Sequence, residues 1–204
     1  MPAVAKLRSH RVPPQAADGP PAGTDAEVIA GSLEEPERFA MIFDRHADEI
    51  HRYAARRLGQ QPAADVVSDV FLAAFRNRGR YELSRADARP WLYGIATKVI
   101  SQHLRSEGRR AHLLAAVAAA SPAEAAADDI GDRITAQRLH QVLRGVLAGL
   151  SPADRELVLL VAWAELPYEQ VAQALQIPIG TVRSRLHRVR AKIRRAIDPA
   201  DAAR

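Results

Sequence analysis

The residues best suited to chemistry lie near the C-terminus, where basic side chains repeat along a predicted helix. Residues 165–197 hold seven Lys and Arg against two Asp and Glu, and all seven bases follow residue 180. Basic groups in such a pattern bind the phosphates and base edges of nucleic acid. On a helical wheel the bases lie outside an apolar arc of roughly 100°, formed by Val182, Leu186, Val189, Ile193, Ala196 and Ile197.

A break ahead of this helix places it in a helix-turn-helix. The sequence predicts a short helix from Tyr168 to Gln176, a tight turn over 177–180, and a last helix that Thr181 caps and that ends at Ile197. In this motif the second helix enters the major groove of DNA. An ordinary solvated basic helix is the alternative, but it does not account for the turn.

The spacing divides the basic helix into two kinds of contact. Its first turns carry the residues expected to reach base edges, which are Arg183, Ser184, His187 and Arg188. Arg185, Arg190 and the later bases are better placed for phosphates.

Three more helices are predicted upstream, over Glu37–Leu58, Pro62–Arg78 and about 88–107. Each has apolar residues at helical spacing. The buried face of the first is expected to comprise Phe39, Ile42, Phe43, Ala47, Ile50, Ala54 and Leu58.

The second of these helices carries a mixed polar face opposite its apolar one. Asp65, Asp69, Leu72 and Arg76 align at i, i+4, i+7 and i+11. Two carboxylates beside an exposed leucine suit a basic, amphipathic partner helix. Taken alone, an ordinary solvated face is the simpler interpretation.

The third helix and the polar segment before it form a second basic region. Arg80 and Tyr81 lie in that segment, and Lys98 and Arg105 lie on one stripe of the helix. A basic helix beside an arginine-rich loop with an aromatic residue can hold a strand of unstacked bases. A basic stripe by itself is more often only solvated.

Composition narrows the class of protein. The 204 residues include no cysteine, which excludes a disulfide scaffold and thiolate zinc sites. No apolar run approaches the ~20 residues that span a bilayer, and no secretory signal is present. We therefore expect a soluble, cytoplasmic protein without membrane insertion. Its 29 Lys and Arg exceed its 24 Asp and Glu.

The segments combine into an all-α fold of two small helical domains on a flexible linker. A Pro-, Ala- and Gly-rich stretch predicts a disordered arm. In the second domain, a helix is expected over 134–148 and Ser151 is expected to cap another that reaches about Trp163. The predicted divisions are an arm at 1–33, a domain at 34–110, a linker at 111–133, a domain at 134–197 and a tail at 198–204.

Catalytic interpretations find little support. The seven histidines are scattered, and His46 is expected to flank a helix rather than bind metal. Asp44, Asp48 and Glu49 are typical of a solvated helix face. Hydrolase, nucleotide-binding and metalloprotease motifs are absent. We predict no enzyme, no catalytic residue, no metal, no cofactor and no small-molecule substrate.

Three motifs together resemble the extracytoplasmic-function (ECF) sigma factors of bacterial RNA polymerase. The stretch ADVVSDVFLAAF at 64–75 is similar to the helix by which that family binds the clamp of the polymerase β′ subunit. RPWLYGIA at 89–96 is similar to the start of the helix by which that family helps to open the −10 promoter element. LPYEQVA at 166–172, followed by IGTVRSRLHRVR at 179–190, is similar to its −35-reading helix-turn-helix.

The resemblance implies a sigma region 2-like domain followed by a region 4-like domain, and a role for each candidate residue. Core polymerase, through its β′ clamp and β subunits, and promoter DNA are the implied partners, and a cognate anti-sigma factor is a family expectation. The implied sites are the core-binding set Asp65, Asp69, Leu72 and Arg76, the −10 set Arg80, Tyr81, Lys98 and Arg105, and the −35 set Arg183, Ser184, Arg185, His187 and Arg188.

Two other classes remain open at this stage. A helix-turn-helix regulator that does not join polymerase would use the first domain to sense a ligand or to dimerise. A nuclease or recombinase would cleave DNA in a metal-dependent reaction.

Overall fold

A computed structural model describes residues 23–118 and 145–197, and within them the chain forms helices and no strand. The prediction of an all-α fold is thereby confirmed. None of the described helices is both long and apolar enough to cross a membrane. The elements are α1 (Asp25–Gly31), the 3-10 helix η1 (Pro36–Phe39), α2 (Ala40–Leu58), α3 (Gln60–Asn77), the 3-10 helix η2 (Arg78–Arg80), α4 (Arg89–Ala118), α6 (Pro152–Ala162), α7 (Tyr168–Leu175) and α8 (Ile179–Ile197).

Helix α1 lies within the segment that the sequence analysis assigned to a disordered arm. Thr24 and Glu27 form a reciprocal capping box at its start. Its apolar side, with Val28 and Ile29 nearly inaccessible, belongs to the main core. The prediction of an arm over 1–33 is therefore wrong for 25–31, because the burial of this short helix depends on contacts with the rest of the domain. The remainder of the arm up to residue 22, and the tail at 198–204, lie outside the described residues.

The first domain packs α2, α3 and α4 around one core. Ile42, Ile50, Val70, Leu92 and Ile100 are each fully buried there. Phe43 was predicted to be buried, but it is 45% exposed and touches the core only at its edge. It lies on the apolar stripe of the sequence, yet its ring meets α3 only edge-on, at Phe71.

Helix α4 extends farther than predicted. It continues to Ala118, eight residues into the segment expected to be a linker. The stretch 111–118 is rich in alanine, the residue with the strongest intrinsic helix propensity. The rest of that linker lies outside the described residues.

In the second domain, Ser151 caps α6 as predicted and accepts a hydrogen bond from the Asp154 N–H. The turn between α7 and α8 differs from the prediction. Gln176 adopts the left-handed conformation that ends α7, and α8 begins at Ile179. Thr181 therefore lies inside the helix rather than capping it. Of the helix expected over 134–148, only 145–148 are described, and they are helical.

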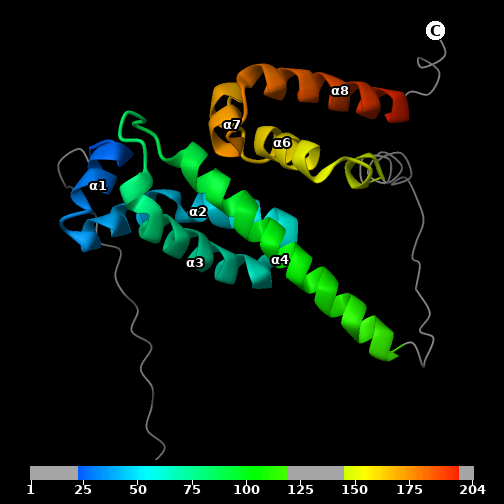
Figure 1. Cartoon of the computed structure of the whole chain (residues 1–204), viewed down its shortest axis with the longest axis horizontal. Helices are drawn as coiled ribbons and strands as arrows, with labels where there is room; N and C mark the ends of the chain where they lie inside the picture. Colours follow the sequence, from blue (N-terminus) through cyan, green and yellow to red (C-terminus); the bar gives the residue numbers. More distant parts are fainter. Residues whose placement is uncertain (1–22, 119–144, 198–204) are drawn as a thin grey trace, which may run out of the picture.

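The long helix α4 contacts α2 and α3 of its own domain and also α7 of the second domain (Figure 1). The two backbones approach closely at Gly94, where an added Cβ would lie 2.6 Å from the carbonyl oxygen of Ala174. Only a residue without a side chain fits this approach. Gly94 therefore permits the domains to pack together.

Polar contacts reinforce the packing of the domains. Arg57 on α2 donates two hydrogen bonds to Glu156 on α6, at 2.6 and 2.5 Å, and the two side chains are only 5% and 14% exposed. Arg89 also donates to the Ala164 carbonyl, at 3.3 Å. Because a buried charge without its partner is costly, the Arg57–Glu156 pair favours one specific arrangement of the domains.

We predict that Gly94→Ala separates the two domains. The new methyl group cannot fit against the Ala174 carbonyl, whereas alanine favours α4 itself by about 0.5–1 kcal/mol. Small-angle X-ray scattering should show a larger radius of gyration. Gly108→Ala is the matched control, since Gly108 lies on the same helix with open space around it. Equal dimensions for the two variants would contradict this prediction.

Candidate nucleic-acid and polymerase interfaces

The exposed side of α8 gathers most of the residues predicted to read DNA. Val182, Leu186 and Val189 are buried against α6 and α7. The predicted base-reading residues lie on the opposite side, and all are exposed: Arg183, Ser184, His187 and Arg188. The sequence periodicity thus predicted this face correctly.

Arg185 lies apart from those four residues. Its side chain is 29% exposed, and its Nε lies 3.9 Å from an Asp154 carboxylate oxygen on α6. It therefore flanks the buried side of α8 instead of joining the exposed face. Arg190, farther along the helix, donates a 2.7 Å hydrogen bond to the Tyr168 hydroxyl.

Two residues of the predicted −10 set meet at one hollow between the domains. Arg80 and Lys98 line a cavity of about 450 Å³, together with Trp91. Gln173 and Gln176, at the end of α7, line the same cavity. Arg105 is exposed about two turns farther along α4. The second domain therefore lies beside this basic region, whose Arg80, Lys98 and Arg105 are all exposed.

Tyr81 is placed differently from the prediction. It is only 7% exposed, its hydroxyl donates to the Arg85 carbonyl at 2.6 Å, and its ring lies 5.0 Å from that of Trp91. In this arrangement the Tyr81 ring is not free to stack on a base. Half-buried Trp91 lines two neighbouring cavities, each together with Arg80.

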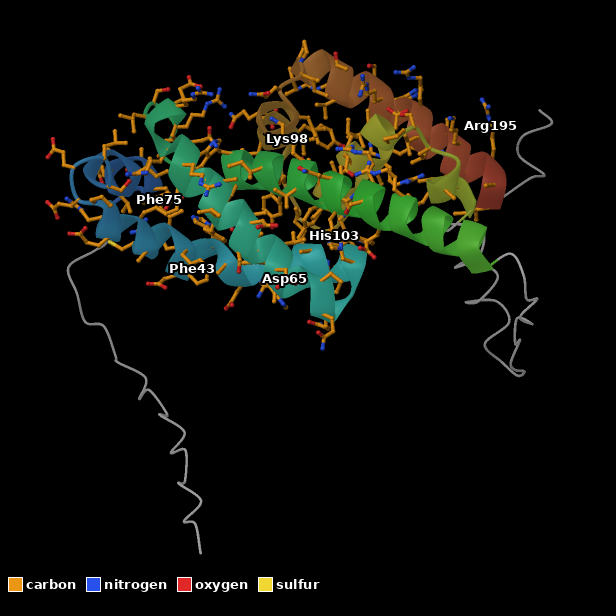
Figure 2. The ribbon with its side chains drawn as sticks, turned by 60° about the horizontal axis from the view of Figure 1, so that its bottom comes forward. Phe43, Asp65, Phe75, Lys98, His103 and Arg195 are labelled. Carbon is orange, nitrogen blue, oxygen red and sulfur yellow. The ribbon has the colours of Figure 1, made fainter. Side chains whose placement is uncertain are left out.

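The mixed face of α3 is exposed along its whole length. Asp65, Asp69, Leu72 and Arg76 are all accessible, and Leu72 is 46% exposed. Phe43 on α2 adds apolar surface beside α3, where its ring meets Phe71 edge-on. Figure 2 shows Phe43 and Asp65 on the side of the first domain away from α7, whereas Lys98 lies close to α7. The α3 face and the −10 region thus lie on different sides of the domain.

A buried charge network joins α1, α2 and the start of α4. His46 Nε2 donates to Asp25 at 2.8 Å, and its Nδ1 donates to Glu49 at 2.7 Å. Arg45 donates to Asp25 at 2.8 Å, and Arg89 donates to Glu49 at 2.9 Å. No group of three metal-ligating side chains is found in the described part of the chain. His46 is thus a structural cation, not the helix-flank residue expected from the sequence.

The network keeps its members charged. Burial by itself disfavours the imidazolium, but hydrogen bonds to Asp25 and Glu49 outweigh burial and raise the pKa of His46 to about 9. Burial likewise opposes ionisation of Asp25, yet hydrogen bonds from His46, Ala88 and Arg45 hold its pKa well below the usual range. At neutral pH both groups are therefore ionised.

Comparison with protein families identifies both domains. The Sigma-70 region 2 family matches residues 42–110, and the Sigma-70 region 4 family matches residues 140–193. The ECF RNA polymerase sigma factor SigE of Mycolicibacterium smegmatis is 31% identical over 85% of this chain and 67% of its own length. The sigma factor CarQ of Myxococcus xanthus is 31% identical over 78% and 88%. SigW of Bacillus subtilis, an ECF sigma factor, is 27% identical over 79% and 89%.

The chain belongs to the ECF sigma factors. It therefore directs RNA polymerase to promoters, and its family consists of DNA-binding initiation factors rather than enzymes. The sigma factor shares its fold with CnrH, solved in complex with the cytosolic domain of CnrY, at a TM-score of 0.56 and 20% identity over 86% of this chain and 98% of that one. The α3 face and the −10 region fall in region 2, and the exposed face of α8 falls in region 4.

We predict that the stability of the sigma factor declines in mildly alkaline solution. The pKa of His46 is about 9 in the fold and 6.5 for an ordinary histidine. Its contribution is therefore complete below pH 6.5 and is lost as the pH rises through about 9. Urea unfolding should show a loss of up to ~3 kcal/mol over this range.

The control is His46→Gln, whose amide donates to one carboxylate but does not titrate. Its unfolding free energy should depend less steeply on pH between 6.5 and 9 than that of the wild type. Parallel curves for the two proteins would rule out His46 as the source of the decline.

Proposed function

We propose that the sigma factor binds core polymerase through the α3 face, the −10 strand through Arg80, Lys98 and Arg105, and the −35 duplex through α8. The observation that carries the proposal is the exposed row on α8, where Arg183, His187 and Arg188 stand opposite a buried apolar side. Such a helix can enter the major groove while its domain stays folded. Arg185 is left out of the base-reading set, and its proposed contact is with a flanking phosphate.

The α3 face supports a protein contact better than a nucleic-acid contact. Asp65 and Asp69 would repel phosphates, and Leu72 offers an apolar anchor that is 46% exposed. A basic, amphipathic surface on polymerase complements this face. We assign it to the β′ clamp.

The −10 strand is proposed to bind at the cavity between the domains. Arg80 and Lys98 are exposed and line this cavity together with Gln173 and Gln176, at the end of α7, so a DNA strand bound there lies beside α7. Arg105 lies beyond this cavity on exposed α4 and can make the first phosphate contact. An anti-sigma factor is a further proposed partner, since the sigma factor RpoE of Bartonella quintana was solved in complex with the anti-sigma factor NepR.

Transcription in a purified system tests the whole proposal. Core polymerase, supplied with genomic DNA, should initiate at discrete promoters only when the sigma factor is added. A stand-alone regulator could bind the same DNA but would not confer initiation on core enzyme. Failure to initiate, together with failure to bind core, would overturn the proposed function.

We predict that the double variant Asp65→Arg, Asp69→Arg no longer assembles with core polymerase. Two reversed charges on an exposed face would repel a basic partner surface, while the domain stays folded because neither side chain is buried. Size-exclusion chromatography with core polymerase measures the loss. The matched control reverses Asp44 and Asp48, exposed acids on α2, and should assemble normally. Equal assembly of the two variants would show that α3 is not the docking face.

We predict that Arg188→Ala lowers discrimination between the −35 sequence and unrelated duplex. A bidentate contact to guanine is worth on the order of 1–3 kcal/mol. Fluorescence anisotropy with both duplexes measures the change. Arg185→Ala serves as the comparison, because its side chain faces Asp154, and it should leave discrimination unchanged. An equal loss on both duplexes would instead assign Arg188 to a phosphate.

A further inference from the structure

We propose that α1 is a brace that sets the shape of the −10 loop, defined as residues 78–88, and that Asp25 is its principal positioning residue. The inference rests on the proposed role of Arg80 in this loop. Asp25 is only 7% exposed, so it acts through the loop rather than on DNA. Helix α1 also precedes residue 42, where the match to the region 2 family begins.

Asp25 holds the C-terminal end of the −10 loop with both its backbone and its side chain. Its N–H donates to the Ala86 carbonyl at 3.0 Å. Its Oδ2 accepts from the Ala88 N–H at 2.9 Å, immediately ahead of α4. A carboxylate at the N-terminus of a helix also interacts favourably with the helix dipole. One residue thus fixes the point at which the loop becomes helix α4.

The opposite end of α1 holds the start of the loop. Arg78 Nε donates to the Ser32 carbonyl at 3.2 Å, and the hydroxyl of fully buried Ser32 donates back to Ile29 at 2.6 Å. The side chain of Leu33 lies beside Gly79. Both ends of the −10 loop are therefore fastened to a helix of seven residues, about 10 Å long.

The carboxylate of Asp25 is itself held in place from α2. Arg45 donates to Oδ1 and His46 to Oδ2, each at 2.8 Å. His46 is oriented in turn by Glu49, which also accepts from Arg89 at the start of α4. Asp25 therefore has one defined position, and so do the loop atoms bonded to it.

A fixed loop matters for capture of a DNA strand. Arg80 lies two residues after the Arg78 anchor and lines the same cavity as Lys98. A loop free to move would have to be ordered when the strand binds, and that entropy cost would weaken binding. The brace removes the cost before DNA arrives.

The test uses the full-length sigma factor assembled with core polymerase. The probe is a fork-junction DNA, with a single-stranded −10 region, taken from a promoter selected by the wild-type holoenzyme. Asp25→Asn keeps the backbone bond to Ala86 but removes the charge that accepts from His46 and Arg45. We expect the dissociation constant for the probe to rise on the order of tenfold. Assembly with core polymerase and affinity for a −35 duplex should not change.

A double-variant cycle separates positioning from general destabilisation. If Asp25 acts through the loop, Asp25→Asn should hardly change the dissociation constant for the probe in an Arg80→Ala background, because the arginine that it positions is already absent. If the two substitutions instead raise the dissociation constant by independent factors that multiply in the double variant, the brace would be overturned. Asp44→Asn, an exposed acid on α2, is the matched control and should bind the probe normally.

A second variant covers the case in which Asp25→Asn does not fold. Thr24→Ala with Glu27→Ala removes the exposed capping box, and so loosens the first turn of α1 without stranding a buried charge. This double change should raise the dissociation constant for the fork-junction probe severalfold and leave the affinity for a −35 duplex unchanged. Unchanged binding of the probe would overturn the brace.

The Arg80→Ala variant tells the two possible failures apart. If it binds the probe normally, the proposed role of the loop fails, and the brace fails with it. If it weakens binding while both α1 changes do not, only the brace is wrong.

Discussion

A carboxylate buried at the first residue of α1 constrains much of region 2. An isolated charge in the interior is very costly, so Asp25 requires donors in fixed places. The structure supplies them from Arg45, His46 and the Ala88 backbone. His46 then needs a second carboxylate, Glu49, to balance its own charge. The geometry of α1, α2 and the start of α4 is therefore set jointly, and none of these elements can shift without leaving a charged group unpaired.

Helix α4 extends this constraint to the second domain. Near its start it carries Arg89, which bonds both Glu49 and the Ala164 carbonyl of the other domain. One turn later Gly94 allows α7 to rest on the helix. This arrangement thus places α7 beside exposed Lys98, across a shared cavity, and leaves the α8 face open.

The elements that could be predicted from the sequence are those whose burial follows a long, regular pattern. Helix α8 offers 19 residues, so its apolar side and its basic face are determined by periodicity alone. Helix α1 has seven residues and begins with an acid, which is too short for periodicity to detect. Phe43 shows the opposite case, because it lies on the apolar stripe yet is 45% exposed, with its ring in edge-on contact with Phe71 of α3.

The side chains whose surroundings could not be predicted depend on partners distant in sequence. Arg185 turns toward Asp154, 31 residues earlier, and Asp25 meets Ala88 at a separation of 63 residues. Tyr81 looked like a free aromatic among arginines, but packing against Trp91 and a hydrogen bond to Arg85 cover it. Local pattern identifies which faces can bind a partner, whereas long-range pairing decides which side chains on those faces are free. The −10 loop depends on long-range pairing, since its two ends bond to a helix that lies about 50 residues before it in the sequence.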